Sequence, residues 1–352
     1  MNSSYKDATL AEIGSAMQLS AEAFQEYKLL NLKSRAEFLR AIAKEIAIIS
    51  SQLISTANRE TNLDESRLQV ELNRTIFQLT SYADACEEGT WLDIRIDTGD
   101  KNANPPKPDL RKLLIPLGPV VVFGASNFPF AYSTAGGDTA CALAAGCTVL
   151  LKAHPAHAET SELVAGAIQK AAKNCGLPEG IFIHLHGADF EVGKALVQHP
   201  LTKAVGFTGS FDGGKALFDL ANSREIPIPV FAEMGSVNPV FILPQKLDSE
   251  TSALAKILAQ SNTQSGGQFC TNPGILVAIA NESLTLFKSL LGTEIKNTAP
   301  VKMLHQGIAK AFRQKRKKAI DEGLSIIATN ETAIEEDDTI PTLAGISAKE
   351  FL

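Results

Sequence analysis

Cys270 is the residue whose type and surroundings point most directly to chemistry. It lies in the polar, glycine-rich stretch NTQSGGQFCTNPG, residues 262–274. This composition favours a loop over a core helix, and a thiol on a polar loop is better placed to react than to pack. An incidental loop cysteine is the alternative. Cys141, Cys147 and Cys175 lie in alanine-rich or apolar segments, so we expect them to be buried structural thiols.

A second candidate is an amide that follows a strongly apolar run. The segment SNFPF begins at Ser126 and has Asn127 soon after the run VVVF, residues 120–123. In α/β proteins, ligands bind at the carboxyl ends of parallel strands. An asparagine amide there can donate a hydrogen bond to a developing oxyanion, a contact worth about 3 kcal/mol in acyl chemistry. A turn asparagine before a helix is the commoner reading of this residue alone.

Two further segments could hold a phosphate. The stretch FTGSFDGG, residues 207–214, has Gly209 and Ser210 where a strand would end and a helix begin, so their N–H groups could face a phosphate. The GxGxxG fingerprint is absent, and a plain glycine turn is an equal alternative. Lys152 follows the apolar run TVLL and could contact a ribose or its 2′-phosphate.

Glu233 follows the apolar run VFA, residues 230–232. A carboxylate at an apolar strand end can have a raised pKa and act as a general base. A solvated glutamate at the end of a strand is the alternative, and it is the commoner case.

Histidine spacing and overall charge exclude several other classes. The pairs His154 with His157 and His184 with His186 lack the three or four converging ligands that zinc needs, so we predict no metal. The chain has 33 basic and 39 acidic residues, a balance that does not indicate nucleic acid. The basic run RQKRKK at 313–318 is more typical of a solvated helix face. The five cysteines are an odd number at irregular spacing, which fits free thiols in a reducing compartment. The sequence also has no apolar run of the length that a membrane span needs, so we expect a cytoplasmic protein.

The elements that would position these residues alternate between short apolar runs and helix-length segments. This βαβ pattern predicts an α/β fold with a doubly wound parallel sheet. Residues 20–60 have helical periodicity, and the cluster GDKNANPPKP between WLDIRID and RKLLI predicts a projecting hairpin near residues 92–115. The expected strands are 120–123, 148–151, 181–185, 204–207, 230–232 and 239–243.

Taken together, the motifs resemble those of one family. SNFPF, GFTGS with Gly214, AEMGSVNP and GGQFC stand in the order and at roughly the spacing of the aldehyde dehydrogenase superfamily. The resemblance runs from the N-terminal helices to the C-terminus. The stretches FPFAYSTAGGDTACALAAGCTVLLKAHPAHAETSELV and FAEMGSVNP resemble its α-ketoglutaric semialdehyde (2,5-dioxopentanoate) dehydrogenase branch, which usually prefers NADP.

This resemblance implies a role for each candidate residue. Cys270 would be the nucleophile that forms a thioester, Asn127 the side-chain donor of the oxyanion hole and Glu233 the general base that activates water. Nicotinamide would accept the hydride, and the substrate would be a small aldehyde. The implied cofactor contacts are Ser126, Lys152, Gly209, Ser210, Gly214 and Gly235. Family members are homo-oligomers, whereas no nucleic-acid or membrane partner is expected.

Two departures from the family pattern bear on these expectations. Residue 155 is proline, where NAD-preferring relatives often have a glutamate, so we expect NADP more readily than NAD. The sequence ends at AKEFL without an EVFGP-like string, whose glutamate contacts the nicotinamide ribose in the family. We therefore expect weak nucleotide binding and slow or no turnover, with a non-catalytic nucleotide-binding remnant as the alternative function.

The predicted organisation is a NAD(P)-binding domain over residues 1–233, with a helical N-terminal layer and the hairpin, followed by a partial α/β catalytic domain over residues 234–352. A cysteine hydrolase without a cofactor is disfavoured, because no Cys and His pairing is evident in the sequence.

Overall fold

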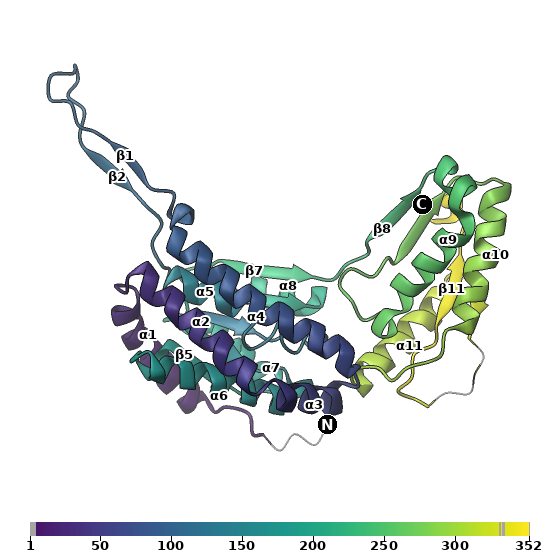
Figure 1. The fold of residues 1–352 in the computed structure, drawn as a ribbon, viewed down its shortest axis with the longest axis horizontal. Helices are drawn as coiled ribbons and strands as arrows, with labels where there is room; N and C mark the ends of the chain where they lie inside the picture. Colours follow the sequence, from purple (N-terminus) through teal and green to yellow (C-terminus); the bar gives the residue numbers. More distant parts are fainter. Residues whose placement is uncertain (1–4, 331, 333–334, 352) are drawn as a thin grey trace. The chain divides into compact units, whose positions relative to one another are not determined.

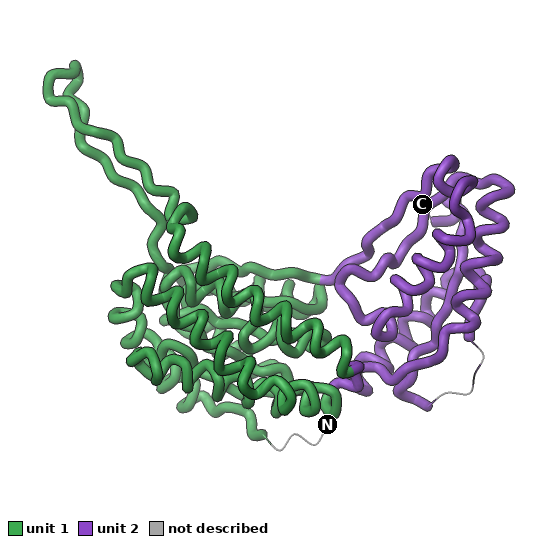
Figure 2. Tube along the Cα trace, in the orientation of Figure 1, with its two compact units in different colours: residues 1–60, 65–234 green, residues 61–64, 235–352 purple. Residues whose placement is uncertain are grey.

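The computed structural model describes residues 5–330, 332 and 335–351. The chain divides into two compact units (Figure 2). The first unit comprises residues 1–60 and 65–234, and the second comprises residues 61–64 and 235–352. Within the described residues, none of the helices has the length and apolar content needed to cross a membrane.

The first unit begins with helices and continues as alternating strands and helices (Figure 1). Its helices are α1 (Leu10–Tyr27), α2 (Leu32–Ile48), α3 (Ser50–Thr61), α4 (Glu65–Glu88), α5 (Gly137–Ala145), α6 (Ala158–Asn174), α7 (Phe190–Gln198) and α8 (Phe211–Asn222). Its strands are β1 (Arg95–Asp97), β2 (Leu110–Lys112), β3 (Val120–Phe123), β4 (Val149–Lys152), β5 (Phe182–Leu185), β6 (Ala204–Gly209) and β7 (Val230–Met234).

The central sheet has five parallel strands in the order β5-β4-β3-β6-β7. The chain first winds outward from β3 to β5, then returns to the other side of β3 and winds outward again to β7. This reversal is the topological switch point of a doubly wound sheet. The predicted fold class is therefore confirmed. The strand bounds differ from the prediction by only one or two residues at most ends.

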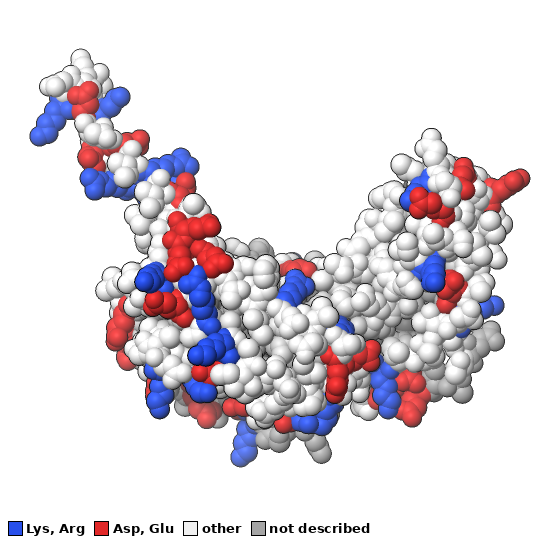
Figure 3. Space-filling view, viewed as in Figure 1, with Lys and Arg blue, Asp and Glu red and all other residues white. Residues whose placement is uncertain are grey.

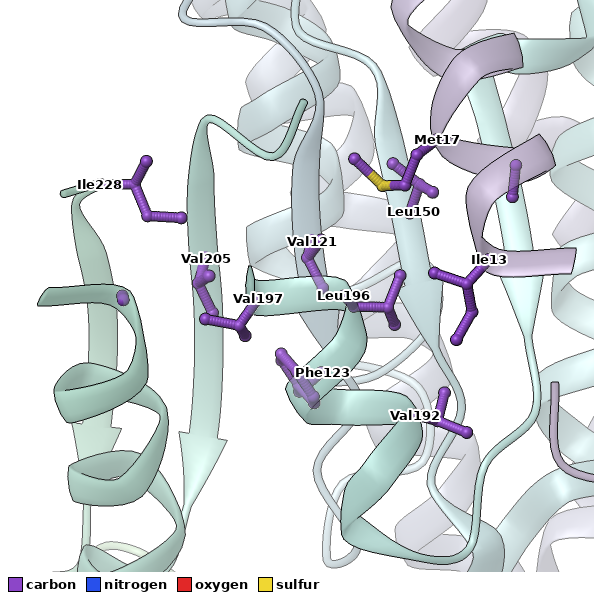
Figure 4. Close-up of a cluster of buried hydrophobic side chains, with 12 residues drawn as sticks. Ile13, Met17, Val121, Phe123, Leu150, Val192, Leu196, Val197, Val205 and Ile228 are labelled. Carbon is purple, nitrogen blue, oxygen red and sulfur yellow. The ribbon is translucent and has the colours of Figure 1, made fainter. Parts of the chain in front are cut away.

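Alternation along the strands sends side chains to both faces of this sheet. Val121 and Phe123 of β3 pack with Val205 of β6 against Leu196 of α7 and Met17 of α1, in a cluster drawn in Figure 4. Val120 and Val122 point to the opposite face, because successive strand residues alternate. Helices α5 and α6 contact the sheet, and α2 packs against both of them and against α4. Both faces are thus covered, as parallel sheets require.

The hairpin strands are shorter than expected. The segment WLDIRID was predicted to be a strand, but residues Thr90–Leu92 form the 3₁₀ helix η1. Asp93 follows in the left-handed region with φ of +46°, so extended pairing begins only at Arg95. Strands β1 and β2 pair antiparallel and are exposed along their length.

The second unit is also built from strands and helices. Strands β8 (Pro239–Ile242) and β9 (Ile275–Ala278) are parallel, whereas β10 (Ser325–Thr329) and β11 (Thr342–Gly345) are antiparallel. Its helices are α9 (Pro244–Thr263), η4 (Gln264–Gly267), α10 (Glu282–Asn297), α11 (Gln306–Asp321) and α12 (Ala348–Phe351). Leu258, Phe287 and Leu291 lie in its apolar core.

The basic run at 313–318 lies on α11, where Lys315, Lys317 and Lys318 are exposed. This agrees with its predicted place on a solvated helix face. On the face that Figure 3 shows, basic and acidic side chains are interspersed.

Candidate active site

One edge of the five-stranded sheet gathers most of the predicted site residues. Because all five strands are parallel, their carboxyl ends meet at this edge. Lys152 ends β4 opposite Phe123, Glu233 of β7 pairs with Thr208 of β6, and Asn127 follows β3. The remaining members at the edge are Ser126, Gly209, Ser210 and Gly214. Cys270 and Gly235 belong to the second unit.

The Asn127 loop is held by a buried carboxylate from α4. Glu71 Oε1 accepts the backbone N–H groups of Phe130 at 2.8 Å and Ala131 at 3.0 Å. Its side chain is only 3% exposed. Arg67, one turn earlier on α4, donates from Nη2 to the carbonyl oxygen of Asn127 at 2.7 Å. The loop carrying the predicted oxyanion donor is therefore fixed by two charged side chains of one helix.

The ring and charge contacts around this loop add to its order. The Arg67 guanidinium lies 4.9 Å from the centre of the Phe128 ring, and Arg67 Nη2 is 3.8 Å from Glu71 Oε2. Burial raises the pKa of Glu71, although the bonds from Ala131 and Phe130 and the charge of Arg67 lower it. The carboxylate is thus held at an electrostatic cost that its partners partly offset.

The turn between β6 and α8 contains the predicted phosphate site. Ser210 is the N-cap of α8, and its Oγ accepts the N–H of Gly213 at 3.2 Å. Gly209 and Ser210 are exposed, as a phosphate contact requires. Gly214 is buried, and a Cβ there would lie 2.3 Å from Met234 Cγ. The glycine at 214 therefore serves the close packing of α8 on β7.

Lys152 is half-buried at the end of β4. Burial lowers its pKa, while the charges of Asp7 and Asp189 raise it. Asp189 is also the N-cap of α7, and its Oδ1 accepts the N–H of Glu191 at 3.0 Å. Two carboxylates therefore lie within electrostatic reach of the cation that was predicted to contact the ribose or its phosphate.

Glu233 is exposed on the edge strand β7. It also affects Asp138 of α5, whose pKa is raised first by burial and then by the charge of Glu233. Exposure gives this carboxylate access to water, which a base that activates water requires.

The Cys270 loop is tied to the start of the second unit by one amide. Asn238 Nδ2 donates to the carbonyl oxygens of Cys270 at 2.7 Å and of Asn272 at 2.9 Å. Asn272 in turn donates to the carbonyl oxygen of Asn262 at 2.8 Å. Just before the thiol, residues 265–267 all have positive φ, between +50° and +73°. Glycine at two of these three positions lowers the cost of this conformation.

The exposure of the other thiols differs from the prediction. Cys147 is buried as expected, but Cys141 and Cys175 are exposed. Cys141 lies in the middle of α5 and Cys175 is the C-cap of α6, and the alanine-rich composition of these segments does not reveal which side of each helix faces solvent. Cys270 is half-buried. Burial nonetheless raises the pKa of the Cys141 and Cys175 thiols. Their thiolate fraction, and hence their nucleophilicity, is reduced.

The sequence reading missed Glu71, Arg67 and Asn238. A signal for Glu71 was present, because it falls on the apolar stripe of α4 formed by Leu68, Leu72 and Leu79, and all four residues are buried. A charged residue on a buried stripe implies a partner. Asn238 was part of the AEMGSVNP motif, but nothing in the sequence connects it to the Cys270 loop.

Comparisons with known proteins agree with this geometry. Residues 2–298 match the sequence profile of the aldehyde dehydrogenase family. The chain is 45% identical over 347 residues to α-ketoglutaric semialdehyde dehydrogenase 2 of Azospirillum brasilense, with 98% of this chain and 66% of that protein covered. It is also 45% identical over 311 residues to α-ketoglutaric semialdehyde dehydrogenase of Acinetobacter baylyi, with 88% and 59% covered. The chain thus spans less than two thirds of the length of these curated relatives.

Solved structures share the fold. An NAD-dependent benzaldehyde dehydrogenase from Corynebacterium glutamicum has a TM-score of 0.81 at 20% identity, covering 98% of this chain and 73% of that chain. A salicylaldehyde dehydrogenase from Pseudomonas putida has a TM-score of 0.82 at 19% identity, covering 96% and 68%. The resemblance to the family and to its α-ketoglutaric semialdehyde branch, expected from the motifs, is confirmed.

The Glu71 contacts generate a prediction about stability. We expect Glu71→Ala to lower the free energy of unfolding by about 3 kcal/mol, because two buried N–H groups lose their acceptor. Glu71→Gln keeps an Oε1 acceptor, so it should cost much less. Urea unfolding of both variants and hydrogen exchange at the Phe130 and Ala131 amides measure these effects.

The contribution of Glu71 to the free energy of unfolding should depend on pH with a definite sign. The pKa of Glu71 is higher in the folded protein than in the unfolded chain. Its contribution to stability is therefore fully present at pH values below its pKa in the unfolded chain, and it is lost as the pH rises through its pKa in the folded protein. Glu71→Gln does not titrate, so it should gain relative to the native protein as pH rises. Equal stability of the Ala and Gln variants at every pH would contradict the proposed hydrogen bonds.

Proposed function

Because the chain belongs to the aldehyde dehydrogenase family, we propose that it oxidises α-ketoglutaric semialdehyde, or a close anionic analogue, to the carboxylate with a nicotinamide cofactor. The observation that carries this proposal is the gathering of Asn127, Lys152, Ser210 and Glu233 at the switch-point edge of one parallel sheet. Nucleotides bind at such edges in doubly wound folds.

The residues at this edge fit a dinucleotide. The N-terminus of α8 provides backbone N–H groups for a pyrophosphate, and Gly209 lies where a Cβ would come within 2.6 Å of the Phe207 ring. Lys152 supplies the nearby cation. We assign nucleotide binding to residues 1–233 and the nucleophile to the domain formed by residues 234–352. Gly235, Gly214 and Ser126 are retained as proposed contacts of the cofactor.

In the proposed reaction the Cys270 thiolate attacks the aldehyde carbon and forms a hemithioacetal. The Asn127 amide and the Cys270 N–H donate hydrogen bonds to its oxyanion. Bound nicotinamide supplies the chemistry of hydride acceptance. The thioester left on Cys270 is then hydrolysed by water from which Glu233 takes a proton. The exposure of Glu233 and the ordering of the Asn127 loop by Glu71 support these two roles.

Arg74, which lies beside the Asn127 loop, favours a substrate that carries a negative charge. Phe128 contacts Tyr132 edge to face, with ring centres 5.2 Å apart. The hydroxyl of Tyr132 accepts a hydrogen bond from Arg74 Nη2 at 2.7 Å. Arg74 is exposed, so its guanidinium is available to a carboxylate at the far end of the aldehyde.

We also propose that NADP binds more tightly than NAD. Lys152 offers a cation to the 2′-phosphate, and Pro155 removes the carboxylate that would repel it. The carboxylates of Asp7 and Asp189 compete for the same ammonium and limit the preference.

The direct test is aldehyde-dependent reduction of NADP by the purified protein with α-ketoglutaric semialdehyde. We expect Cys270→Ser to abolish it. Glu233→Gln should give a burst of reduced cofactor followed by slow turnover, because the thioester accumulates. Mass spectrometry of the quenched variant should find the acyl group on Cys270. Steady-state turnover of Glu233→Gln equal to that of the native protein would remove Glu233 from the mechanism.

Cofactor preference is tested by equilibrium titration, which needs no turnover. Lys152→Ala should weaken NADP binding by roughly ten- to a hundredfold, since it removes a charge-assisted contact, and should affect NAD much less. Asp189→Asn keeps an N-cap for α7, yet it removes a competing charge and should strengthen NADP relative to NAD. Equal losses for both nucleotides in Lys152→Ala would contradict a contact with the 2′-phosphate.

Substrate charge is tested at Arg74. Arg74→Gln should raise the KM for α-ketoglutaric semialdehyde roughly tenfold with little change in kcat, because it removes one charge-assisted hydrogen bond. The KM for pentanal, which has no carboxylate, should stay the same. Arg95→Gln on the exposed hairpin is the matched control. A parallel loss for both aldehydes would show that Arg74 supports the loop rather than the substrate.

A further inference from the structure

Two histidines and a glutamate converge at the β5 edge of the sheet. His184 lies on β5, His186 follows two residues later, and Glu162 lies on α6, which packs against β5 (Figure 1). Residues two apart on an extended strand point to the same side. The spacing His-x-His therefore brings both imidazoles toward the helix that covers this face.

The three ligand atoms already lie close together. Glu162 Oε2 is 3.1 Å from His184 Nδ1 and 2.7 Å from His186 Nε2. All three atoms lie within 4.8 Å of one another. In a tetrahedral zinc site with bonds of about 2.0–2.1 Å, ligand atoms are about 3.3 Å apart. Only small side-chain adjustments would admit an ion.

Neighbouring groups hold the two rings in this orientation. His184 Nε2 lies 2.8 Å from Ser161 Oγ, which is 2.7 Å from Thr134 Oγ1, and both hydroxyl-bearing residues are buried. The Tyr5 ring stacks on His186 at 4.2 Å between ring centres. A hydrogen bond on one ring nitrogen fixes the tautomer that leaves the other nitrogen available as a ligand.

We propose that Glu162, His184 and His186 bind a divalent ion of the zinc class. Two imidazole nitrogens and one carboxylate suit Zn²⁺, Co²⁺ or Ni²⁺, whereas Mg²⁺ and Ca²⁺ prefer oxygen ligands. The Glu162 side chain is 52% exposed, so solvent can reach the cluster and water can fill the fourth position. The sequence analysis predicted no metal because it did not identify the third ligand, Glu162, which lies on the separate helix α6.

The ion would join α6 to β5, the outermost strand of the sheet, which lies beside β4 and its proposed cofactor contact Lys152. Leu185, which lies between the two histidines, pairs with Lys152 of β4. Metal binding should therefore stabilise the first unit whether or not the chain turns over an aldehyde. This site is independent of the function proposed above.

The test is zinc titration of the full chain after its accessible thiols have been alkylated, so that no cysteine exposed to solvent can bind metal. We expect calorimetry to show one Zn²⁺ per chain, a Tm that rises with added Zn²⁺, and no heat with Mg²⁺. Co²⁺ should give visible absorption bands without a thiolate charge-transfer band.

Variants locate the ion. Glu162→Gln changes a half-exposed side chain, so it should fold normally and lose zinc binding, as should His186→Gln. Ser161→Ala should weaken binding roughly tenfold, because it frees the His184 ring. Glu159→Gln on the same helix and His199→Gln are matched controls that should bind as the native protein does. Absence of zinc binding by the native protein, or unchanged binding by folded Glu162→Gln, would overturn the proposal.

Discussion

The parallel pairing of β3 with both β4 and β6 is the constraint on which the first unit depends. The register of β3 aligns Phe123 with Lys152 on one side and with Phe207 on the other. The chain continues from β3 into α5 on one face of the sheet and from β6 into α8 on the other, which is the arrangement at which doubly wound folds bind ligands. Asn127 and Ser210 lie where they do because of this pairing, and local sequence preference alone would not bring them together.

Side chains from other segments hold three of the loops described above. Glu71 binds the loop after β3, and Asn238 binds the loop of Cys270. Asp7 Oδ1 accepts the N–H of Ala188 at 2.8 Å in the loop after β5. Loops without regular backbone pairing need such acceptors and donors, since an unpaired buried polar group costs free energy. Order in these three loops is thus supplied by polar side chains that lie outside the loops themselves.

The sequence predicted the parts of this arrangement that are periodic or local. Apolar runs identified the strands, and residues such as Lys152 and Glu233 could be assigned to strand ends because the pattern changes there. Partners that lie far apart in the chain were not predictable. Glu71 and Glu162 are charged residues on helices, and only tertiary packing makes one a buried acceptor and the other a neighbour of two histidines. The exposure of Cys141 was misjudged for the same reason, because composition does not say which side of a helix faces the core.

The spacing of these contacts along the chain has a consequence for the order of folding. Asn238 reaches the Cys270 loop across 32 residues within one unit, so the loop can be organised by nearby chain. The switch-point edge requires Val120 to pair with Ala204, and helices α5, α6 and α7 and strands β4 and β5 lie between them in the chain. Contacts of longer sequence separation form more slowly, because the entropy of loop closure must be overcome before they contribute. We therefore expect the nucleotide edge to reach its native structure later than the Cys270 loop, and its strands to be open to misassociation until they pair.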